Sequence, residues 1–136
     1  MTSPAKTPAA RLTFRLHARP SSAIQLRRRL RAWLEHQGVA EPEIFDILLA
    51  ASEAFANAVE HPRTPAASVV DVEARIEDGM LEVAVRDHGS WRDKREREEG
   101  GLGFPIMRSL MERVDVDSQA DGSRITLRRL LRSSVG

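Results

Sequence analysis

Apolar residues recur along the first third of the chain with two different periods, and each period predicts an element. Residues 11–18 (RLTFRLHA) alternate apolar and polar side chains, which is typical of a half-buried strand. Residues 21–37 instead carry leucines and a tryptophan at helical spacing, with arginines on the remaining faces. Gly38 follows at the position of a helix C-cap, so the sequence predicts a strand and then a helix.

A second helix is predicted from about Glu41 to His61. Pro42 suits its first turn, acidic residues there favour the helix dipole, and Pro62 ends it. One arc of this helix is apolar and is therefore expected to lie in the core. The residues of that arc are Ile44, Ile47, Leu48, Ala51, Phe55 and Ala58.

The second half of the chain predicts more strands and one more helix. Residues 68–78 and 80–87 alternate on either side of an Asp-Gly turn, which is a strong hairpin signal. A helix is expected over residues 105–114, and a closing strand over residues 121–130. This order needs few parallel crossovers, so we predict an α+β fold: a two-layer sandwich with helices on one face of a mainly antiparallel sheet.

The composition fits a single globular domain. The chain has 136 residues, of which 41% are hydrophobic and 30% charged, and its net charge of +1 gives no general case for binding nucleic acid or membranes. It has no cysteine, which excludes disulfides and thiolate metal sites and suits a cytoplasmic location. No apolar run approaches the roughly 20 residues that cross a bilayer. We expect a domain over residues 11–131, between a disordered tail at 1–10 and a short tail at 132–136.

Three polar residues form a stripe on the second helix. Glu53, Asn57 and His61 recur every four residues in EAFANAVEH and fall within an arc of roughly 80°, apart from the apolar arc. An asparagine oxygen can ligate Mg²⁺, and a glutamate one turn earlier can orient or deprotonate a nucleophile. The alternative is an ordinary half-exposed helix. Small residues border the stripe and are expected to leave open space above it: Ala50, Ala54 and Ala56.

A second candidate group follows the hairpin. Asp87 ends an apolar strand in the sequence Asp87-His88-Gly89, where a carboxylate can accept a hydrogen bond from an exocyclic amine such as that of adenine. Gly89 would let the backbone approach a flat base closely. The same three-residue pattern is also among the commonest turn signals.

The glycine-rich segment GGLGFP is a candidate anion site. Gly100, Gly101 and Gly103 give a flexible backbone whose N–H groups can wrap an anion, and the helix start behind them adds a positive end. The alternative is a plain loop before a helix. The charged residues 90–99 ahead of it form either a mobile lid over a nucleotide or a solvated surface helix.

Taken in this order, the segments resemble the GHKL (Bergerat-fold) ATP-binding domain, and within it the small anti-sigma-factor serine kinases of bacterial sporulation and stress regulation. The matching motifs are EAFANAVEH, DHG, GGLGFPIMRSLMERVDV and DGSRITL, and the resemblance covers about residues 11–131. Two positions depart from the family pattern. Trp91 stands where a second glycine is usual after Gly89, and Ser123 replaces the usual threonine while keeping the hydroxyl.

The resemblance implies a role for each matching position. Glu53 would be the catalytic base or water-orienting carboxylate, and Asn57 the Mg²⁺ ligand. Asp87 would accept from the adenine amine, while His61 is either a site residue or a structural histidine at the helix end. The other residues implied to bind ATP are Gly89, Gly101, Leu102, Gly103 and Ser123.

The activity implied is an ATP- and Mg²⁺-dependent serine/threonine-protein kinase. It would phosphorylate an anti-anti-sigma factor and sequester a sigma factor, and the resemblance also suggests a homodimer. One alternative is an ATP-binding module that sequesters its partner without phosphoryl transfer.

A sensor histidine kinase fragment is disfavoured, since no predicted dimerisation helix carries a phospho-acceptor histidine. Nucleic-acid binding through residues 27–31 or 128–132 is also disfavoured, because these arginine clusters lack interleaved aromatics; the first cluster suits an acidic partner surface or dimerisation.

Overall fold

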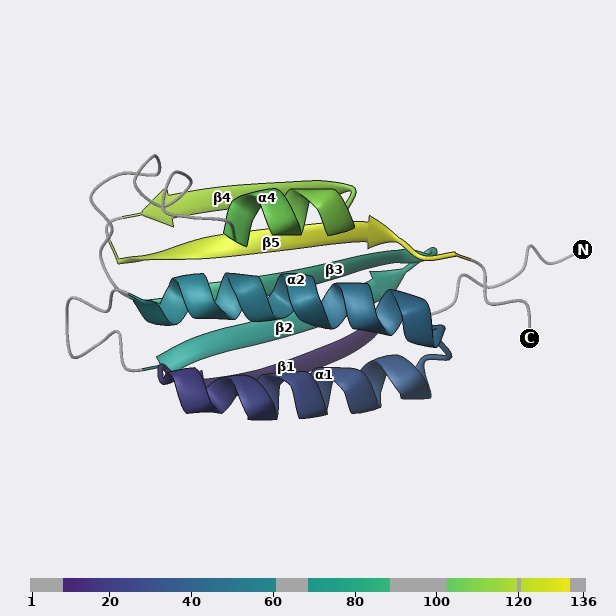
Figure 1. Cartoon of the computed structure of the whole chain (residues 1–136), viewed down its shortest axis with the longest axis horizontal. Coiled ribbons are helices and arrows are strands. Elements are labelled where there is room, and N and C mark those ends of the chain that lie inside the picture. The colour runs from purple at the N-terminus through teal and green to yellow at the C-terminus, as the bar shows by residue number, and fades with distance from the viewer. Residues whose placement is uncertain (1–8, 61–68, 89–102, 120, 133–136) are drawn as a thin grey trace, which may run out of the picture.

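A five-stranded antiparallel sheet forms one layer of the protein, and its helices form the other (Figure 1). The computed structural model describes residues 9–60, 69–88, 103–119 and 121–132. Within these residues the elements in chain order are β1 (Ala10–His17), η1 (Pro20–Ser22), α1 (Ala23–His36), α2 (Glu41–Glu60), β2 (Val69–Glu77), β3 (Met80–Asp87), α4 (Gly103–Leu110), β4 (Arg113–Gln119) and β5 (Gly122–Leu130).

The strand order is β1-β2-β3-β5-β4, and every neighbouring pair is antiparallel. The helices α1, α2 and α4 cover one face of the sheet (Figure 1). Because side chains alternate along a strand, each strand buries every second residue under the helices and directs the others to the outer face. The predicted α+β sandwich is therefore confirmed, and the outer face is the side of the sheet away from the helices.

The turns that the sequence predicts are present. Asp78 and Gly79 join β2 to β3 with φ angles of 51° and 78°, the left-handed values that a two-residue hairpin turn requires. Gly38 ends α1 with a φ of 78°, and the N–H of Val39 donates to the carbonyl of Leu34 at 3.1 Å. This hydrogen bond completes a Schellman cap, so the predicted C-cap is confirmed.

The central helix α2 buries a wider arc than the sequence predicts. All six residues of the expected apolar arc are buried, but so are Ala50 and Ala54, which are 0% exposed. The expectation that Ala50 and Ala54 leave open space is wrong, because α2 packs against α1, α4 and the sheet at once, whereas Ala56 is exposed. None of the helices within the described residues is long and apolar enough to cross a membrane.

The prediction of a helix over residues 105–114 is wrong at its C-terminal end. The helix α4 ends at Leu110, and Arg113–Gln119 form an edge strand, β4, that the sequence analysis missed. Val114 continues the helical spacing of Met107 and Leu110, which extended the predicted helix past its true end. Pairing with β5 gives the backbone of β4 its hydrogen bonds and decides the outcome in favour of a strand.

A buried ion network ties the two layers together at the N-terminal end of α2. Arg129 of β5 reaches Glu43 at 3.4 Å and Asp46 at 3.0 Å, and it also donates to the carbonyl of Leu110 at 3.1 Å. The side chains of Arg129 and Glu43 are only 14% and 5% exposed. The backbone N–H of Arg132 donates to Glu43 as well, at 3.2 Å. This network fixes α2, α4 and the last strand relative to one another.

Candidate functional site

Four elements meet at one end of the molecule. There α2 and β3 finish, and α4 and β5 begin (Figure 1). The candidate residues Glu53, Asn57, Asp87 and Ser123 lie on these elements near that end, although they are far apart in the sequence. The fold therefore gathers the two groups of candidate residues that the sequence analysis treated separately.

Glu53 lies directly against the first residue of α4. A Cβ atom placed on Gly103 would stand 3.2 Å from the Glu53 Oε2 atom, which is tighter than an ordinary contact. The first N–H groups of a helix have no partner within that helix and carry the positive end of its dipole. The half-buried Glu53 carboxylate is thus held beside an N-terminus that can also attract an anion.

Asn57 lies one turn further along α2 and is also half-buried. In the described part of the chain, no group of three or more His, Asp or Glu residues could hold a metal ion alone. A cation at Asn57 would thus take most of its ligands from phosphate oxygens and water, an arrangement that Mg²⁺ favours. The neutral amide is suited to that role.

Asp87 is buried beneath the helices at the end of β3. It is 2% exposed, and the backbone N–H of Ser123 donates to its Oδ1 atom at 3.3 Å. Ser123 stands directly opposite Asp87 in the ladder between β3 and β5 and is equally buried. The hydroxyl of Ser123 lies 3.5 Å from that of Ser118. A buried carboxylate that can accept hydrogen bonds therefore lies in the sheet at this end of the molecule.

Gly122 allows this close approach, a role that the sequence analysis missed. A Cβ atom on Gly122 would lie 2.2 Å from the carbonyl oxygen of Asp87 and 3.1 Å from the Cα atom of His88. Only a residue without a side chain lets β5 begin so near the end of β3. The Gly122-Ser123 pair after Asp121 is the sequence feature that indicates this close approach.

Several predicted residues lie outside the part of the chain that the structure describes. They are His61, Gly89, residues 90–99, Gly100, Gly101 and Leu102. Their expected roles in binding a nucleotide remain predictions.

The outer face carries a group that the sequence analysis did not predict. Asp71 of β2 accepts from the Arg15 Nε atom at 2.7 Å and pairs with the His88 Nε2 atom at 2.7 Å. The hydrogen bond from Arg15 lowers the pKa of Asp71 below its usual value, and the bond with His88 acts in the same direction. Arg15 and Asp71 are directly opposite in the β1–β2 ladder, so strand register, rather than sequence spacing, brings them together.

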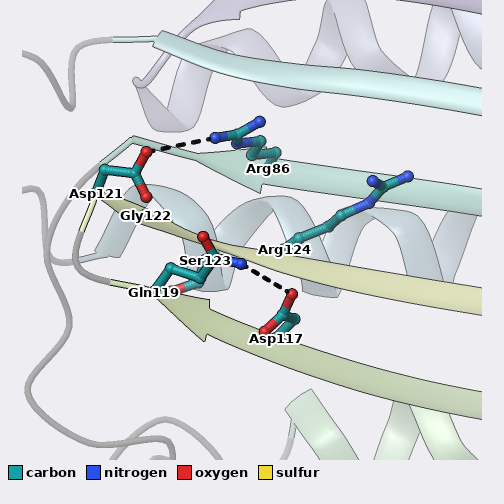
Figure 2. A pocket seen from close by; sticks show the side chains of 7 residues that line it. All are labelled: Arg86, Asp117, Gln119, Asp121, Gly122, Ser123 and Arg124. Carbon is teal, nitrogen blue, oxygen red and sulfur yellow. Dashed lines mark hydrogen bonds and ion pairs between the residues drawn. The ribbon is translucent and has the colours of Figure 1, made fainter.

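A hollow of about 140 Å³ on the outer face lies beside the start of β5 (Figure 2). Figure 2 shows Arg86 directed towards Asp121, at 3.7 Å, and Gln119 beside Asp117, at 3.5 Å. Its lining is charged or polar, whereas a site for a flat base needs mostly apolar walls. The buried Asp87 end on the helix side is the better candidate for a nucleotide.

Known proteins resemble this chain in sequence and in fold. The family model of the histidine kinase-like ATPase domain matches residues 16–129. The chain is 32% identical over 100 residues to the anti-sigma F factor of Clostridium acetobutylicum, which is 64% of this chain and 70% of that protein. It is 30% identical over 106 residues to the anti-sigma F factor of Geobacillus kaustophilus, which is 68% of this chain and 73% of that protein.

Two solved structures have the same fold. One contains the RsbU and RsbW domains of a Mycobacterium tuberculosis protein; it has a TM-score of 0.71 and 32% identity and covers 92% of this chain. This chain spans only 33% of that longer one. The other is the SiaB–SiaC complex of Pseudomonas aeruginosa, with a TM-score of 0.65, 16% identity and coverage of 87% and 88% of the two chains.

Proposed function

Because this chain belongs to the histidine kinase-like ATPase domain family, we propose that it is an ATP-binding anti-sigma factor with serine/threonine-protein kinase activity. Its protein substrate would be an anti-anti-sigma factor, and it would sequester a sigma factor. The observation that carries this proposal is the contact between Glu53 and the first residue of α4 at the end of the molecule where Asp87 is buried. A carboxylate for catalysis, a helix N-terminus for phosphates and an acceptor for a base would then serve one site.

The described residues fit a nucleotide. Asp87 is a buried acceptor whose position is fixed by the amide of Ser123, and it would bind the exocyclic amine of adenine. The glycine segment that ends at Gly103 would direct its N–H groups at the phosphates. Gly89, Gly101 and Leu102 belong to this proposal on the strength of the family motifs.

Asn57 would contribute one oxygen ligand to Mg²⁺, and Glu53 would accept the proton of the partner's hydroxyl or orient it. Bound ATP with Mg²⁺ would supply the phosphoryl group and neutralise the charge around it. The chain itself would contribute positioning and fixed hydrogen-bond donors.

The protein partners are inferred from the relatives. Two of these are named anti-sigma F factors, so a sigma factor is the partner to be sequestered and an anti-anti-sigma factor the phosphorylated antagonist. On α1, Arg27, Arg28 and Arg29 are exposed and present positive charge to an acidic partner surface. A homodimer and a cytoplasmic location complete the proposal.

The test combines binding with phosphoryl transfer. Calorimetry of the full chain should detect ATP binding that strengthens when Mg²⁺ is added, and Asn57→Ala should remove most of the Mg²⁺ effect. Glu53→Ala should bind ATP but fail to transfer labelled phosphate to an anti-anti-sigma protein. Transfer at the wild-type rate by Glu53→Ala would contradict the assignment of the base. If the wild-type chain binds ATP and its partner but transfers nothing, the protein is a sequestering module without kinase activity.

A further inference from the structure

Three side chains form a continuous chain of hydrogen bonds across the outer face, below the proposed nucleotide site. Arg15 of β1 contacts both carboxylate oxygens of Asp71, at 2.7 Å through Nε and 3.2 Å through its terminal nitrogen. Asp71 in turn lies 2.7 Å from the Nε2 atom of His88. A two-point contact with a guanidinium fixes the plane of a carboxylate, so Asp71 offers His88 an oxygen in a defined position.

His88 is the residue that follows Asp87, and the ladder stops just before it. Asp87 is the last residue of β3 and pairs with Val70 on one side and Ser123 on the other. None of these strand pairings includes His88. The bond to Asp71 ties the side chain of His88 to β2.

Asp87 and His88 extend to opposite sides of the sheet. Asp87 is buried under the helices, whereas His88 is bonded to Asp71, which lies on the outer face between the buried residues Val70 and Val72. An ionised carboxylate can only accept hydrogen bonds, so the Nε2 atom of His88 donates to Asp71. This arrangement fixes the ring and limits rotation of the backbone between the two residues.

We infer that Asp71 and His88 are positioning residues for adenine recognition: their hydrogen bond holds the end of β3 so that the Asp87 carboxylate is aimed at the exocyclic amine. The inference rests on the proposed function. It extends the nucleotide site through the sheet to residues that never touch the nucleotide. It also gives the histidine of the Asp87-His88-Gly89 sequence a role that differs from that of a plain turn residue.

The experiment measures the preference for ATP over inosine triphosphate, which lacks the exocyclic amine. The wild-type chain should bind ATP about tenfold more tightly, the worth of one hydrogen bond to a charged group. His88→Ala and Asp71→Ala should reduce this preference to about twofold, since the Asp87 carboxylate is then no longer held in position to accept from the exocyclic amine. His88→Gln should restore it, because a glutamine amide can donate to Asp71 from about the same place as Nε2.

Glu73→Ala is the matched control, since Glu73 is the next outward residue on β2. It should leave the preference unchanged. The inference is overturned if His88→Ala keeps the wild-type preference, or if Glu73→Ala loses it equally. If Asp71→Ala does not fold, the comparison of His88→Ala with His88→Gln still tests the inference. His88 lies outside the strand ladder, so its replacement removes no strand pairing. A wild-type chain that binds neither nucleotide would instead contradict the proposed function, and this inference with it.

Discussion

Gly103 and Glu53 are in such close contact that a single methyl group between them would have to displace the carboxylate. The added Cβ would lie 3.2 Å from Glu53 Oε2, at the end of a flexible side chain that can shift by a few tenths of an ångström. For Gly103→Ala we therefore expect a change of less than about 1 kcal/mol in the free energy of unfolding, since alanine also favours the helix. Phosphoryl transfer should fall about tenfold, because catalysis depends on the position of that carboxylate.

Denaturant unfolding and transfer assays on the same variant separate the two effects. Ser109→Ala, on an exposed turn of α4 away from Glu53, is the control and should leave transfer unchanged. Equal transfer rates for Gly103→Ala and the wild type would show that the contact has no part in catalysis.

Gly122 should be far less tolerant than Gly79. A Cβ on Gly122 would clash with the carbonyl oxygen of Asp87 at 2.2 Å, whereas one on Gly79 would meet nothing within 4 Å. Gly79→Ala should cost only about 1 kcal/mol, for its left-handed backbone, and leave ATP affinity intact. Gly122→Ala should cost more than about 2 kcal/mol and weaken ATP binding, since relief of the clash moves Asp87.

Thermal or urea unfolding measures the loss of stability in each variant, and calorimetry measures its ATP affinity. If Gly122→Ala were as stable as Gly79→Ala and bound ATP normally, the close approach of β5 to β3 would be unnecessary for the site.

The core and the hairpin were predictable because they depend on periodicity and turn chemistry. The apolar arc of α2 follows from its helical spacing, and Asp78-Gly79 from the φ angles that the turn requires. β4 was not predictable in this way. Its short alternation follows Met107 and Leu110 closely enough to continue their helical pattern, and the partner that makes it a strand lies in β5.

The candidate site also has a part that the sequence predicts and a part that it does not. Glu53, Asn57 and Asp87 were predicted from local motifs, and the fold brings their elements to one end of the molecule. The contact between Glu53 and Gly103 joins residues far apart in sequence, so helix packing decides it. Asp71 was missed because its importance depends on strand register, which places it opposite Arg15.

The ion pair between Arg15 and Asp71 should make part of the stability depend on pH. The pKa of Asp71 is lower in the folded chain than its ordinary value of 3.8, so the unfolded chain takes up a proton first as the pH falls. The pair therefore stabilises the fold fully above about pH 4 and loses this effect as the pH drops through the lowered value. The unfolding free energies of wild type and Asp71→Asn should differ at pH 6 and converge in acid.

Urea unfolding between pH 3 and pH 7 checks this prediction. Glu73→Gln, on the same strand and face, should run parallel to the wild type over the range in which Asp71→Asn converges with it. A constant difference between wild type and Asp71→Asn down to pH 3 would mean that Asp71 contributes through packing and not through its charge.

The buried network around Arg129 should govern stability without affecting the nucleotide site. Arg129→Met would leave the Glu43 carboxylate, which is 5% exposed, without its ion-pair partner, and we expect a loss of about 3 kcal/mol. Adding Glu43→Gln should recover part of that loss, because a neutral amide oxygen can still accept from the N–H of Arg132. ATP affinity should stay within about twofold of the wild type in both variants, since the network lies at the opposite end of α2 from Asn57. Urea unfolding measures the stability of the variants, and calorimetry measures their ATP affinity. A double variant less stable than Arg129→Met would show that the Glu43 charge is compensated by something other than Arg129.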